Sequence, residues 1–265
     1  MHTFCKGMAA ATVALTLAAT AHAGTFVFDW NQGDNGTNNS AGTFKSIQAT
    51  YNTSTDMLTW SATFGRVSAG ITDGFTLALN NGPNPKGHAG ELALLYFDGS
   101  STSAPVLSVY AYNGRNASDS WRDGDGNLSG NQTPDFIGSS KTNVSWISNL
   151  SVVDNGNMRT FSFDMDASVV RAHTPAYPGS SDWYGIGFGD GDPAGMLGIW
   201  LHSYIGYAAQ YDALGRLTSF SSRTQGWFDG SNIPVTTTIP LPGAGAMGIA
   251  GLLGIAGARR RRRAA

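Results

Sequence analysis

Short apolar stretches separated by turn-forming residues recur along most of this chain, and they constrain its fold more than any other feature. In the clearest stretch, apolar residues alternate with hydroxyl-bearing residues: Leu58, Trp60, Ala62 and Phe64 against Thr59, Ser61 and Thr63. Alternation with a period of two is that of a strand with one face buried and the other in water. Clusters of Gly, Asn, Asp and Ser between the stretches supply the turns.

These patterns predict eleven strands in an all-β domain. The expected strands are 25–30, 44–51, 57–64, 74–79, 92–97, 106–112, 144–150, 159–165, 183–188, 196–204 and 214–220. So many strands with little helix predict a two-sheet, antiparallel, jelly-roll-like sandwich. Because 92–97 is apolar throughout, we expect a central strand that is covered on both faces. Residues 113–141 are expected to form a long loop, which in a small domain is often functional.

The first 23 residues have the pattern of a secretory signal peptide. Lys6 provides a positive start, an apolar run follows at 8–20, and small residues at Ala21 and Ala23 mark a cleavage site before Gly24. The alternative, a membrane helix, is disfavoured because this run is too short for the roughly 30 Å of bilayer hydrocarbon. The sequence therefore predicts export, cleavage by signal peptidase and a mature chain that starts at Gly24.

The last 27 residues, 239–265, predict a membrane-associated tail in three parts. A proline motif comes first, an uncharged run of small and apolar residues follows at 244–258, and a cluster of arginines closes the span: Arg259, Arg260, Arg261, Arg262 and Arg263. Because guanidinium groups resist translocation, the arginines are expected to stay on the cytoplasmic side, with the domain before them facing outward. The exported domain then covers residues 24–238.

The order of these parts resembles the PEP-CTERM sorting signals, most closely their Val-Pro-Leu-Pro-Ala variety. The resemblance covers 239–263 and implies an exosortase-like membrane enzyme that cuts near the motif, which includes Pro240, Leu241, Pro242 and Gly243. The product would then be released or attached at the cell surface. Leu241 stands where a glutamate is usual, and Gly243 follows the second proline, which leaves the identity of the processing enzyme open. A permanent membrane anchor is the alternative interpretation.

Charge and cysteine content exclude two classes of function. The two ends carry six of the 16 basic residues and none of the 18 acidic ones, so the central domain has a net charge of −8. A protein this acidic lacks the basic face that a nucleic-acid partner requires. The single cysteine, Cys5, lies within the signal peptide. The mature domain therefore has neither disulfides nor thiol chemistry.

Two Asp/Gly-rich stretches are candidate calcium sites. Asp123, Asp125 and Asn127 alternate with other residues, and their oxygens suit a hard cation such as calcium. The EF-hand pattern is not met, because Leu128 takes the place of its glycine and Pro134 that of its last acid. Asp190 and Asp192 form a similar, shorter stretch. In both places the alternative is an Asp-Gly turn with solvated carboxylates.

Aromatic residues near polar loops are candidate carbohydrate ligands. Exposed rings beside Asp and Asn can stack on a sugar and hydrogen-bond to it. The candidates are Trp121, Tyr177, Trp183 and Trp227. Core packing is the alternative for any aromatic residue, and it fits Trp60 and Trp200 well.

No local motif predicts an enzyme. A GxSxG nucleophile elbow is absent, Glu91 is the only glutamate, and the spacing of His88, His173 and His202 is not that of metal ligands. We therefore expect a non-enzymatic protein of the cell surface or extracellular matrix, with polysaccharide as a plausible partner. Two alternatives remain open, namely a calcium-dependent carbohydrate-binding module and a secreted hydrolase with dispersed catalytic residues.

Overall fold

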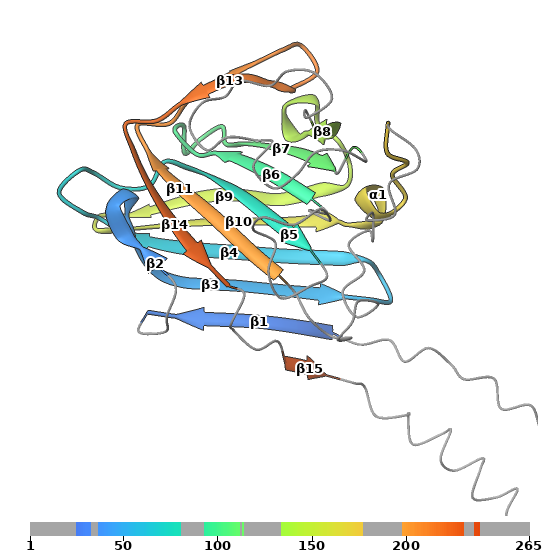
Figure 1. Ribbon diagram of the computed structural model, residues 1–265, viewed down its shortest axis with the longest axis horizontal. Coiled ribbons are helices and arrows are strands. Elements are labelled where there is room, and N and C mark those ends of the chain that lie inside the picture. The colour runs from blue at the N-terminus through green and yellow to red at the C-terminus, as the bar shows by residue number, and fades with distance from the viewer. Residues whose placement is uncertain are drawn as a thin grey trace, which may run out of the picture.

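Two antiparallel sheets pack face to face in the computed structural model, which describes residues 25–32, 37–80, 93–111, 113, 134–176, 198–230 and 236–238 (Figure 1). The six-stranded sheet has the order β15 (Thr236–Thr238), β1 (Thr25–Asn31), β3 (Thr43–Asn52), β4 (Met57–Gly65), β10 (Met158–Asp166) and β9 (Ile147–Asn155). The seven-stranded sheet has the order β2 (Thr37–Asn38), β14 (Thr224–Asp229), β11 (Gly198–Ile205), β5 (Gly74–Asn80), β6 (Ala93–Asp98), β7 (Val106–Ala111) and β8 (Asp135–Ser139). The predicted all-β antiparallel sandwich is confirmed.

Helix is scarce in the described part of the chain. It comprises the four-residue α1 (Ser168–Arg171) and two single turns of 3-10 helix, Asn39–Ala41 and Ser140–Thr142. Among the described residues, no helix has both the length and the apolar character that crossing a bilayer would need. The signal peptide and the sorting tail lie outside the described residues, so their assignments stay predictions.

Large aromatic side chains fill the space between the sheets. Phe161 of β10 meets Phe75 and Phe97 of the opposite sheet at ring-centroid distances of 5.3 and 5.2 Å, with interplanar angles of 77° and 85°. Edge-to-face pairs of this kind stabilise a core beyond the area that they bury. The alternation predicted in β4 is observed, because Leu58, Trp60, Ala62 and Phe64 are all buried.

A third layer covers part of the outer face of the seven-stranded sheet. Strands β12 (Ala208–Tyr211) and β13 (Leu217–Ser221) form a hairpin there, and Tyr207, Leu217 and Phe220 pack on Tyr96 and other outward-facing residues. This layer explains why β6 is apolar up to its last residue, Asp98, and is covered on both faces as the sequence predicted. Its residues 93–97 are all buried, on one side by the sandwich core and on the other by the second cluster.

The β12–β13 hairpin is a bent extension of the pair β11 and β14, which are neighbours in the sheet. The chain turns at Gly206, whose φ of +72° lies in the left-handed region. The Asp73 carboxylate fixes this bend by accepting hydrogen bonds from the backbone N–H groups of Gly206 and Tyr207, both at 2.9 Å. Burial raises the pKa of Asp73 above its usual value, while these two donors act in the opposite direction.

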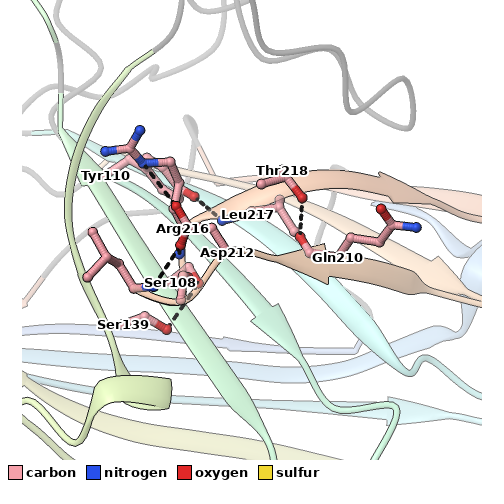
Figure 2. Close-up of polar contacts among 10 residues, drawn as sticks. Ser108, Tyr110, Ser139, Gln210, Asp212, Arg216, Leu217 and Thr218 are labelled. Carbon is pink, nitrogen blue, oxygen red and sulfur yellow. Dashed lines mark hydrogen bonds and ion pairs between the residues drawn. The ribbon is translucent and has the colours of Figure 1, made fainter.

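Figure 2 shows the tip of the hairpin anchored on β7. The Ser108 hydroxyl donates to the carbonyl oxygen of Gly215 at 2.8 Å, and the Leu217 N–H donates to the Tyr110 hydroxyl at 2.7 Å. Asp212 closes the turn by accepting from the N–H groups of Leu214 and Arg216, both at 2.9 Å. The hairpin is thus bonded to the sandwich at both of its ends.

Several expectations from the sequence need correction. Residues 113–141 were expected to be loop, but 135–139 form β8 because Phe136 packs on Tyr110 at 5.2 Å. The strand expected at 144–150 is β9, Ile147–Asn155, which begins three residues later and ends at the turn before Met158. Strands β2, β12, β14 and β15 were not predicted. The strand expected at 183–188 lies outside the described residues.

Candidate carbohydrate-binding surface

Of the residues predicted from sequence to bind or to be processed, Trp227 alone lies in the part of the chain that the structure describes. The other candidates lie outside it: Ala23, Gly24, Trp121, Asp123, Asp125, Asn127, Tyr177, Trp183, Asp190, Asp192, Pro240, Leu241, Pro242, Gly243 and Arg259 to Arg263. Among the described residues, no group of three or more His, Cys, Asp or Glu could hold a metal ion. The calcium stretches therefore stay predictions.

Trp227 is an exposed aromatic residue with a rigid support. It lies on the outer face of β14, with 36 % of its surface exposed, while its neighbour Phe228 is fully buried in the core. Its indole lies nearly parallel to that of Trp200 on β11, at an interplanar angle of 13° and a centroid distance of 5.5 Å. Trp200 is itself only 9 % exposed, so it is a fixed support for one face of the Trp227 ring.

Polar side chains surround this ring because of the strand register. Trp227 pairs with His202 on β11 and with Asn38 on β2. Gln225 and Asp229 lie two residues to either side on β14, so they share its face of the sheet. We call this set the Trp227 surface; its members are Asn38, Trp200, His202, Gln225, Trp227 and Asp229.

The Trp227 surface has the chemistry of a saccharide platform. A flat apolar ring can stack on the C–H groups of a sugar, while adjacent amide and carboxylate groups bond to its hydroxyls. The indole N–H of Trp227 has no hydrogen-bond partner within the described residues, so it is an available donor. Because Trp200 already holds the ring, binding orders little that was free beforehand.

The sequence identified only half of the aromatic pair. Trp200 was assigned to core packing, and it is indeed buried, but against the second cluster on the outside of the seven-stranded sheet. Its contact with Trp227 joins strands that are far apart in sequence, so no local pattern could reveal it. The ring centroid of His202 lies 5.2 Å from that of Trp200.

A histidine–carboxylate pair lies elsewhere, beside α1. The Nε2 atom of His173 is 2.8 Å from the Asp135 carboxylate, which also accepts from the Ala176 N–H at 2.8 Å. Such a pair can orient a general base. Here it connects the segment that follows α1 to the first residue of β8.

Comparisons of the chain with family models, with curated proteins and with solved structures return no match. The chemistry of the described residues therefore carries the functional interpretation.

Proposed function

We propose that this chain is an exported, non-enzymatic protein of the cell surface or extracellular matrix, processed at its C-terminal sorting tail, that binds polysaccharide through the Trp227 surface. The observation that carries the binding proposal is the exposed indole of Trp227, held flat against Trp200 at 5.5 Å beside amide and carboxylate side chains. The polar tip and apolar body of an exposed indole suit a ligand that has both hydroxyls and C–H groups, as a sugar does.

The arrangement of the chain ends supports the export part of the proposal. Thr25 on β1 pairs with Thr238 on β15. In the sequence, Thr25 comes just after the predicted signal cleavage site and Thr238 directly precedes the tail that holds the predicted proline motif. Both cuts would fall outside the paired strands, so processing would leave the sandwich complete.

Retardation of the full-length chain in gels that contain soluble polysaccharides tests the binding proposal. Trp227→Ala is expected to weaken the retardation by about tenfold or more, as truncation of a central aromatic contact does. Leu214→Ala is the matched control, because Leu214 is a large apolar residue with 59 % exposure on the hairpin turn, away from the Trp227 surface. Equal retardation of wild type and Trp227→Ala by every polysaccharide that binds would contradict the proposal.

A further inference from the structure

The outer face of the six-stranded sheet is covered with short polar side chains. On β3 and β4 the outward positions include Gln48, Thr50, Thr59 and Ser61, because the residues between them, such as Ala49 and Trp60, are buried in the core. The strand register sets Thr50 opposite Thr59 and Gln48 opposite Ser61. Hydroxyl and amide groups thus form rows that run across the strands.

A pocket of about 280 Å³ lies in this face. Its lining comes from β1, β3 and β4: Val27, Phe28, Asp29, Gln48, Ala49, Thr50, Thr59 and Ser61. Since the side chains of Phe28 and Ala49 belong to the core, these two residues contribute backbone to the floor. The volume is close to the lower limit of about 300 Å³ for small-ligand pockets, which suits a single sugar ring rather than a larger ligand.

The hydroxyls in the pocket differ from those beside it. Outside the pocket, Thr63 bonds to Thr160 at 2.9 Å, and Ser151 bonds to Ser162 at 2.8 Å. Within the pocket, Thr50, Thr59 and Ser61 make no side-chain hydrogen bond to any described residue. Three hydroxyls that make no hydrogen bond within the sheet are therefore gathered around the cavity.

The charge of the pocket lining indicates a ligand without negative charge. Asp29 accepts through Oδ1 from Gln48 at 3.3 Å and from Asn31 at 3.2 Å, which leaves its Oδ2 for a ligand hydroxyl. No Lys, Arg or His is among the lining residues, so an anionic ligand would meet only the negative charge of Asp29. Val27 adds an apolar contact on one wall. A neutral ring with several hydroxyls satisfies all of these groups.

We infer that this pocket is a second saccharide site, which takes one neutral hexose unit of a polysaccharide. The evidence for this site is the pocket and its hydroxyls, and none of it involves the Trp227 surface. The two sites occupy the outer faces of different sheets, so they lie on opposite sides of the sandwich (Figure 1). A domain with sites on both sides can hold two polysaccharide chains together.

Titration of the full-length chain, in a detergent that contains no sugar, with D-glucose, D-galactose and D-mannose tests the inference. The readout is the amide NMR spectrum. Saturable shifts are expected at the pocket residues of β1 and β3 with at least one of these hexoses. Thr59→Val and Asp29→Asn are each expected to weaken that binding at least about fivefold, because the first removes a hydroxyl partner and the second replaces a charged acceptor by a neutral amide. Thr59 and Asp29 are exposed, and the dispersion of each variant's spectrum reports that it folds.

Two control variants separate the pocket from its surroundings. Thr63→Val lies on the same strand and face, but its hydroxyl is bonded to Thr160, so the hexose Kd should not change. Trp227→Ala should also leave the hexose Kd of the pocket unchanged. The two sites can therefore fail or succeed separately in these tests. The inference is overturned if no hexose shifts the pocket, if Thr59→Val and Asp29→Asn bind as wild type does, if Thr63→Val loses as much, or if calcium chloride alone shifts the pocket.

Discussion

At the scale of single residues, two glycines with similar backbone conformations occupy opposite surroundings. Gly215 and Gly156 have φ values of +80° and +62°, both in the region that disfavours side chains. A Cβ on Gly215 would lie 2.6 Å from the Cβ of Ser139, whereas one on Gly156 would meet nothing within 4 Å. Ser139 cannot easily withdraw, because its hydroxyl accepts from the Lys141 N–H at 3.3 Å.

Alanine at these two glycines should therefore cost different amounts of stability. Gly156→Ala is expected to lose about 1 kcal/mol of unfolding free energy from backbone strain alone. Gly215→Ala should lose about 2–4 kcal/mol, since overpacking against β8 adds to the same strain. Urea unfolding measures both losses. If the two variants lost equal stability, the hairpin tip would not be in close contact with the sandwich.

At the scale of elements, the sequence predicted the strands of the sandwich better than the third layer. Strands such as β4 follow a strict alternation that one wet face imposes, and β6 is a continuous apolar run, so their burial is encoded locally. The hairpin strand β12, Ala208–Tyr211, has two exposed and two half-buried residues and none that is fully buried, and its place depends on a bend at Gly206 and on the distant Asp73. The pocket could not be predicted from the sequence either. Its Thr and Ser residues alternate with apolar residues as on any wet sheet face, and nothing local tells which hydroxyls lack a hydrogen-bond partner.

Two tyrosines beneath and within the hairpin test how it is held. Tyr110 accepts the hydrogen bond of the buried Leu217 N–H, so Tyr110→Phe leaves that donor unpaired and should cost about 1–3 kcal/mol. The buried Tyr207 hydroxyl has no partner within the described residues, so Tyr207→Phe should be neutral or stabilising. Thermal and urea unfolding of the two variants measure the contrast. A loss in Tyr207→Phe as large as that in Tyr110→Phe would contradict this account of the hairpin.

At the scale of the whole molecule, the closing strand of the six-stranded sheet joins the fold to the proposed processing. Among the described strands, β15 pairs with β1 alone, through Thr236, Thr237 and Thr238, and the predicted proline motif begins directly afterwards in the sequence. A cut within that motif would keep β15 on the mature domain. A cut a few residues earlier would expose the backbone of β1 as a new sheet edge, which is a site of aggregation.

Chains of three lengths should reveal this dependence. A chain that ends at Pro242 and one that ends at Thr238 are expected to unfold at the same urea concentration, because both retain β15. A chain that ends at Gly230 should lose about 1–3 kcal/mol, the net contribution of the few backbone hydrogen bonds between β15 and β1, and should aggregate more readily. The natural product recovered from the cell surface should match the two longer chains in stability, with its C-terminus, read by mass spectrometry, within 239–243. Recovery of the uncut chain from the cytosol would contradict the proposed export, and equal stability of all three lengths would show that β15 contributes nothing to the sheet.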